Sequence, residues 1–170
     1  MTMDIAGFCL PRYAQIPGVG LYLEQVVRYI NAHLAPLGEP ELTSSMVSNY
    51  VKQGLIPAPV RKLYTAEHLA RLLFIAVVKP VVPLEGLRLM FGIQEDNYPL
   101  PTAYDYFCDE FENMLGAAFG VAPAMEGLGE TQSDAKDLLR NTISATVNKV
   151  YLDPVSYTHL RAHETSQDLV

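Results

Sequence analysis

The sequence predicts a mainly α-helical protein with a compact N-terminal head and a helical C-terminal region. Apolar residues recur at spacings of three and four along several segments, which is the pattern of helices that bury one face. No segment alternates between apolar and polar residues for long enough to predict more than a small wing. With 170 residues, of which 49% are apolar, the chain is long enough to bury a hydrophobic core.

The first two helices are predicted from their apolar stripes and their end signals. Residues 21–34 carry one stripe, and Pro36 ends it. Thr43 is expected to cap a second helix, because a threonine hydroxyl can accept a hydrogen bond from a free backbone N–H of the first turn. Gly54 suits the position just after the last turn. The buried face of this helix is predicted to hold Met46, Val47 and Tyr50.

An extended segment and two further helices follow. Residues 56–60 hold two prolines and cannot be helical, so this segment is predicted to be extended or turned, with Arg61 and Lys62 at its exit. Thr65 is expected to cap the third helix. A short helix is then predicted over residues 84–91.

The C-terminal region is predicted to hold two more helices. A proline-containing break over residues 97–101 should precede a helix capped by Thr102, with Asp105 completing a capping box. Residues 116–129 are rich in glycine and alanine and are predicted to form a mobile connection. Ser133 should then cap the last helix.

The charges are unevenly distributed along the chain. The net charge is −7, but residues 1–80 hold seven basic and five acidic residues, whereas residues 81–153 hold four basic and twelve acidic ones. Residues 43–64 hold three basic residues and no acidic one. A segment that approaches phosphates should have this composition, although three charges predict weak binding by a monomer.

The same segment carries a recognisable motif. Thr43 stands at a helix cap, Tyr50 is the helix aromatic, residues 54–57 read Gly-Leu-Ile-Pro, and residues 64–67 read Tyr-Thr-Ala-Glu. This run resembles the MerR pattern of a capped recognition helix, a wing and a following helix. Residues 10–91 also resemble, more closely, a bacterial family of unknown function with a MerR-like helix-turn-helix.

The resemblance implies a winged helix-turn-helix head over residues 1–92 that binds double-stranded DNA as a transcriptional regulator. A recognition helix over residues 43–53 would enter the major groove, beside a short wing over residues 56–64. Short polar side chains would reach base edges, and basic ones would contact phosphates. Tyr50 could either pack inward or contact a phosphate. The implied DNA-binding residues are Thr43, Ser44, Ser45, Ser48, Asn49, Tyr50, Lys52, Arg61, Lys62 and Tyr64.

An alternative function stays open, which is a protein-interaction module on the same scaffold without strong DNA binding. Ser48 and Asn49 stand where the MerR pattern usually has an arginine and an aromatic residue, and the overall charge is acidic. The wing has only residues 60–63 between Pro59 and Tyr64, which is shorter than usual. Residues 93–153 would dimerise or bind an effector of unknown identity.

Enzyme chemistry is not expected. The sequence holds no glycine-rich phosphate loop, no nucleophile motif and no paired histidine and carboxylate spacing, so we predict no catalytic residue, cofactor or metal. Cys9 and Cys108 are expected to be buried thiols, and His33 and His68 to lie on helix surfaces. The acidic residues at 105–112 should form a solvated helix face.

The two ends of the sequence carry separate signals. The first ten residues lack the pattern of a secretory signal, and no apolar run approaches the roughly 20 residues that cross a bilayer, so we expect a cytoplasmic protein without membrane contact. Residues 155–165 read V-S-Y-T-H-L-R-A-H-E-T, which resembles a translated transposase sequencing adaptor. We therefore expect the natural sequence to depart from this one after Asp153, and we exclude residues 154–170 from the fold prediction.

Overall fold

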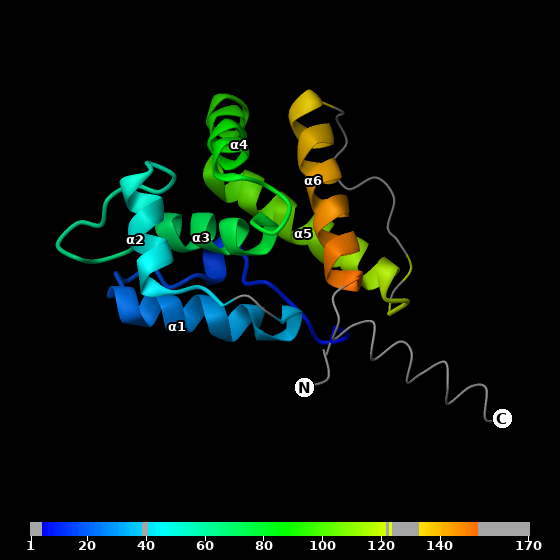
Figure 1. Cartoon of the computed structure of the whole chain (residues 1–170), viewed down its shortest axis with the longest axis horizontal. Coiled ribbons are helices and arrows are strands. Elements are labelled where there is room, and N and C mark those ends of the chain that lie inside the picture. Colours follow the sequence, from blue (N-terminus) through cyan, green and yellow to red (C-terminus); the bar gives the residue numbers. More distant parts are fainter. Residues whose placement is uncertain (1–4, 39–40, 122, 124–132, 153–170) are drawn as a thin grey trace.

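The computed structural model describes residues 5–38, 41–121, 123 and 133–152. Residues 154–170 and half of the connection predicted at residues 116–129 lie outside this description. Residues 116–118, predicted to belong to that mobile connection, are helical. The described chain is mainly helical (Figure 1). In chain order its helices are the 3₁₀ turn η1 (Tyr13–Gln15), α1 (Leu23–Leu34), the 3₁₀ turn η2 (Ala35–Leu37), α2 (Ser44–Lys52), α3 (Ala66–Val78), α4 (Leu84–Asn97), α5 (Leu100–Ala118) and α6 (Asp134–Tyr151).

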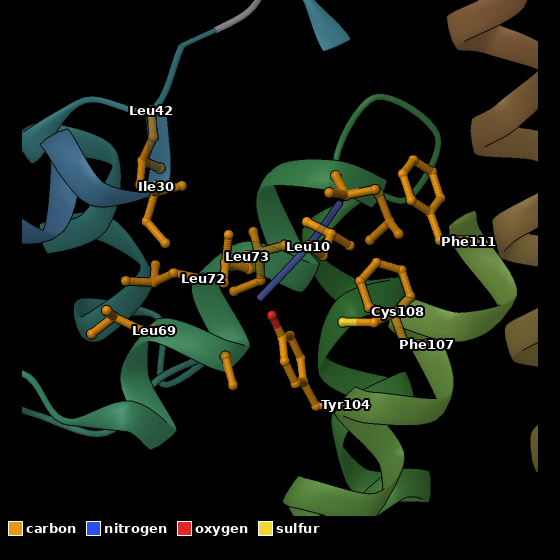
Figure 2. Close-up of a cluster of buried hydrophobic side chains, with 14 of the residues drawn as sticks. Leu10, Ile30, Leu42, Leu69, Leu72, Leu73, Tyr104, Phe107, Cys108 and Phe111 are labelled. Carbon is orange, nitrogen blue, oxygen red and sulfur yellow. The ribbon is translucent and has the colours of Figure 1, made fainter. Parts of the chain in front are cut away.

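Helix α3 lies at the centre of the molecule because it is apolar almost all round. On one side it packs against α1 and α2, where Leu69 and Leu72 meet Ile30 and Leu42 (Figure 2). On the other side it packs against α5, where the buried side chains are aromatic. Phe74 meets Phe107 edge to face, with the ring centroids 4.9 Å apart. One core therefore joins the head to the C-terminal helices.

Helix α2 begins and ends as the sequence predicts. The hydroxyl of Thr43 accepts a hydrogen bond from the Met46 N–H at 3.2 Å. At the other end Gly54 adopts φ +72°, and Leu55 donates its N–H to the carbonyl of Tyr50 at 2.9 Å. This arrangement is the Schellman motif, which uses a left-handed glycine to satisfy the last free carbonyls. Local hydrogen bonding thus fixes both ends of the helix.

The predicted wing is not a pair of strands. Among the described residues no strand forms, and this region holds only two isolated bridges, Val60 to Leu63 and Leu21 to Tyr64. The physical reason is in the sequence, because Pro57 and Pro59 lack the N–H groups that a ladder requires. The structure therefore confirms a mainly helical fold, and where a short wing was expected it has a two-residue turn.

The start of α5 differs from the prediction. The helix begins at Leu100 and not after a cap at Thr102, because Pro101 occupies its first turn, where a missing N–H costs nothing. Asp105 therefore lies inside the helix, and its carboxylate accepts the N–H of Tyr13 at 2.8 Å. Helix α4 is also longer than predicted, since it continues from Phe91 to Asn97.

Three side chains lie elsewhere than expected. His68 is buried at 5% exposure, because both of its ring nitrogens find partners inside the protein. Cys9 is exposed, because it precedes the buried Leu10 on an extended segment, whereas Cys108 is buried as expected. Glu110 is buried at 1% exposure, so the acidic face of α5 is only partly solvated.

Helices α5 and α6 run side by side in the same direction. Contacts between them follow the same order along both helices: Lys136 lies over the ring of Tyr106, Arg140 lies 3.8 Å from Glu110, and Phe119 meets Tyr151. Ser133 caps α6 as predicted, accepting the Lys136 N–H at 3.3 Å. No helix within the described ranges is long and apolar enough to cross a membrane.

Candidate nucleic-acid interface

Helix α2 divides into a buried face and an exposed polar face. Val47 and Tyr50 are buried at 0% and 1% exposure and hold the helix against the core. The opposite face is open to solvent, and its exposed side chains are Ser44, Ser45, Ser48, Asn49 and Lys52. The structure thus brings together five of the predicted site residues on one surface, and Thr43 caps the helix beside them.

Two predicted site residues do not face this surface. Tyr50 lies in the core, with the ammonium of Lys79 5.6 Å from its ring centroid. Tyr64 is 5% exposed and packs edge to face against His68, with the ring centroids 5.2 Å apart. Because both side chains are buried, we remove them from the candidate interface and assign them packing roles.

Arg61 and Lys62 form the tip of a tight turn beside α2. Their φ angles are +54° and +64°, and Leu63 donates its N–H to the carbonyl of Val60 at 2.9 Å. Positive φ at both central residues defines a type I′ turn, which usually contains asparagine and glycine. Side chains with a Cβ atom are strained there by about 1–2 kcal/mol per residue. Such strain is a common feature of functional sites.

The turn is held against the start of α1. Leu21 and Tyr64 exchange two backbone hydrogen bonds, at 2.9 and 2.8 Å. A Cβ atom on Gly20 would lie 2.7 Å from the Cβ of Leu63, so only glycine permits this close approach. These backbone contacts therefore fix the position of the two cations relative to the start of α1.

His68 fixes the segment between α2 and the turn. Its Nδ1 accepts the N–H of Thr65 at 2.9 Å, so the proton of the neutral ring is on Nε2, which donates to the carbonyl of Pro57 at 3.0 Å. The signal for this role was present in the sequence, because a histidine three residues after a threonine cap occupies the reciprocal position of a capping box.

Arg88 is a basic residue beside this surface that the sequence did not indicate. Its Nη1 donates to the carbonyl of Gln53 at 2.8 Å, which places a cation from α4 at the C-terminal end of α2. The acidic neighbour Glu85 lies 3.8 Å away and is 86% exposed, so its attraction to Arg88 is weak. We define the basic edge as Lys52, Arg61, Lys62 and Arg88.

The exposed surface of α2 and the basic edge carry polar and positively charged groups. This surface offers hydroxyl and amide groups from α2 and cations from the basic edge, which suit hydrogen bonding and anion contact. Within the described ranges, no group of three histidine, cysteine or acidic side chains is placed to hold a metal ion.

Comparison with known proteins gives one match. A family model described as "Domain of unknown function (DUF1836)" matches residues 11–107, which is more than half of the chain and includes α1 to α4 and the first part of α5. No curated protein and no solved structure matches the chain.

Proposed function

Because the chain belongs to the DUF1836 family, whose description names no activity, we propose a function from its geometry: the protein is a transcriptional regulator that binds double-stranded DNA. The observation that supports this proposal most directly is the exposed polar face of α2 next to a strained turn that carries Arg61 and Lys62. The MerR-like motif around Thr43 supports the same proposal.

The dimensions of α2 suit the major groove. A helix with its side chains is about 10–12 Å across, and the major groove of B-DNA is about 12 Å wide. In this arrangement Asn49 donates and accepts hydrogen bonds at an adenine edge, which is the base that asparagine recognises best. Ser44, Ser45 and Ser48 contribute hydrogen bonds of low individual specificity. The buried Val47 fixes the helix from behind.

The basic edge supplies contacts to phosphates. Lys52, Arg61 and Lys62 are all exposed, and none has a carboxylate partner among the described ion pairs. Each phosphate contact contributes about −0.9 to the slope of log K against log salt concentration, so three contacts give a slope of about −3 per protomer. A single protomer then binds weakly, and two protomers on adjacent half-sites would double the slope of log K against log salt concentration.

The test is alanine replacement of Lys52, Arg61 and Lys62 together, followed by fluorescence anisotropy on duplex DNA at several salt concentrations. The triple variant should lose most of its affinity, and the magnitude of its salt slope should fall by about 3, which leaves only the contribution of Arg88. The matched control is Lys149→Ala, which removes an exposed lysine near the end of α6, on the opposite side of the molecule from α2 (Figure 1). Equal affinities and slopes for the triple variant and the control would refute the proposal.

A second candidate function is protein recognition by the same head. It is favoured by three exposed apolar side chains at or near the turn. Val60 begins the turn, and Val19 and Tyr22 flank Gly20 and Leu21, which lie against Leu63 and Tyr64. Val19, Tyr22 and Val60 are 73%, 58% and 72% exposed. Exposed apolar groups close together are common at protein interfaces. Val60→Ser separates the two candidates, because it removes an exposed apolar group without adding a charge beside Arg61. It should weaken binding to a protein partner while leaving contacts to phosphates in place.

A further inference from the structure

A cavity of about 320 Å³ lies among the helices α3, α4, α5 and α6. Its walls are mainly apolar and include Phe74, Phe91, Phe107 and Leu139. The cavity is partly open to solvent, because Thr102 and Leu138 on its wall are exposed. The volume falls at the lower end of the range of small-molecule sites, which is about 300–1,000 Å³.

The side-chain amide of Gln94 on the cavity wall has an acceptor without a partner. Gln94 donates its Nε2 to the carbonyl of Tyr98 at 2.8 Å, which fixes the orientation of the amide. The Oε1 of the same amide is buried and accepts no hydrogen bond. A buried carbonyl without a donor is unfavourable, and a ligand that donates an N–H or O–H would satisfy it.

The charged groups on the wall already have contacts, although the buried Nε of Arg71 makes no hydrogen bond. The guanidinium of Arg71 contacts Glu95 at 2.8 Å and lies 4.8 Å from the ring centroid of Phe91. The ammonium of Lys136 lies 5.4 Å from the ring centroid of Tyr106. An anionic ligand would have to compete for these cations, whereas a neutral ligand leaves them in place.

We infer that this cavity is a binding site for a small, neutral, mainly apolar molecule that donates one hydrogen bond to Gln94. An apolar cavity of about 150 Å³ is known to accommodate one benzene molecule, so a volume of about 320 Å³ fits a larger ligand of two or three aromatic rings. The ligand would enter between α4, α5 and α6, and its donor group would meet Oε1 of Gln94.

The cavity is connected to α2 through Arg71. This side chain lines the cavity and donates from Nη1 to the carbonyl of Leu55 at 3.4 Å. Leu55 in turn donates to Tyr50 and closes the last turn of α2. A ligand that packs against Arg71 without displacing it therefore stabilises the contact that holds the end of the helix that we propose to enter DNA. This regulatory step rests on the proposed function, whereas the binding site does not.

The binding site is tested with N-phenyl-1-naphthylamine, a neutral aromatic amine with one N–H that becomes fluorescent in apolar surroundings. The full-length protein should bind one equivalent saturably. Ala135→Phe fills the cavity from α6 and should weaken binding at least tenfold, whereas Ala145→Phe, at an exposed position on the same helix, should not. Equal affinities for these two variants would overturn the assignment.

Two further measurements test the ligand class without altering the volume of the cavity. Gln94→Met keeps the side-chain length and removes the acceptor, so it should weaken binding about threefold to tenfold. An unchanged affinity would overturn the role of Gln94. 1-Anilinonaphthalene-8-sulfonate has the same rings and adds a negative charge, so it should bind more weakly. Tighter binding of this anion would overturn the assignment of a neutral ligand.

The link to α2 is tested by measuring the affinity for duplex DNA with and without saturating N-phenyl-1-naphthylamine. We expect a change of at least threefold, and the duplex should change the affinity for the dye by the same factor. An unchanged DNA affinity would overturn the link. If the wild-type protein binds no DNA at all, the proposed function fails while the result for the cavity stands.

Discussion

Replacing the strained tip of the turn should separate stability from DNA binding. Arg61 and Lys62 occupy the two positions of a type I′ turn with φ values of +54° and +64°. The double substitution Arg61→Asn and Lys62→Gly installs the pair that this turn favours, and it removes both cations. We expect a protein that is more stable than the wild type and binds DNA more weakly.

The size of the stabilisation follows from the backbone. Left-handed conformations cost about 1–2 kcal/mol for each ordinary residue, and asparagine and glycine relieve most of this cost. The new glycine lowers this stabilisation by about 0.5–1 kcal/mol, because glycine has more conformational freedom in the unfolded chain and loses more of it on folding. The net increase in the free energy of unfolding should be about 1–2 kcal/mol. For a chain of this length the melting temperature should rise by about 2–8 °C.

The assay is urea unfolding followed by circular dichroism, with DNA anisotropy in parallel. The matched control is Arg61→Ala with Lys62→Ala, which removes the same charges but keeps side chains with a Cβ atom in left-handed positions. Both double variants should lower the magnitude of the salt slope by about 2. Only the variant with asparagine and glycine should be stabilised.

Two results would refute this reasoning. Equal stabilities for the two double variants would show that the turn is not strained by Arg61 and Lys62. An unchanged salt slope in both variants would show that these cations do not contact phosphates.

Three further outcomes are expected from single residues. Gly54→Ala should lower the free energy of unfolding by about 1–2 kcal/mol, seen as a lower urea midpoint, because φ is +72° there. Arg71→Met should lower the free energy of unfolding by about 1–2 kcal/mol, as measured by urea unfolding. The loss is smaller than the 3–5 kcal/mol of a fully buried ion pair, because the partner Glu95 is 57% exposed and remains hydrated. Burial raises the pKa of Cys108 to about 12, whereas an ordinary thiol in the unfolded chain has a pKa of 9.0. The free energy of unfolding should therefore fall as the pH rises from 9 towards 12, and mass spectrometry should find iodoacetamide on the exposed Cys9 before Cys108.

The parts of the fold that the sequence predicts are those with local causes. Helix α2 was predicted with its cap and its stop, because Thr43 and Gly54 act on backbone groups only a few residues away. The mainly helical fold followed from apolar spacing. The start of α5 was missed although its cause is local, because Pro101 was interpreted as a break when it occupies a first turn.

The parts that the sequence did not predict depend on distant partners. Arg88 reaches Gln53 from 35 positions along the chain, and no local pattern indicates this contact. The cavity forms only when four helices pack together, so its residues are not marked in the sequence. The role of His68 could be predicted only in part. Its position three residues after Thr65 indicates the capping contact, but nothing local in the sequence indicates its hydrogen bond to the carbonyl of Pro57.

The most direct test of the central claim is fluorescence anisotropy of the wild-type protein on two duplexes at two salt concentrations. One duplex is the DNA directly upstream of its own coding sequence, and the other has the same composition in scrambled order. A sequence-specific regulator should bind the upstream DNA more tightly, and this preference should persist at the higher salt concentration. Equal binding to both duplexes that disappears at the higher salt concentration, or no binding to either, would contradict the account.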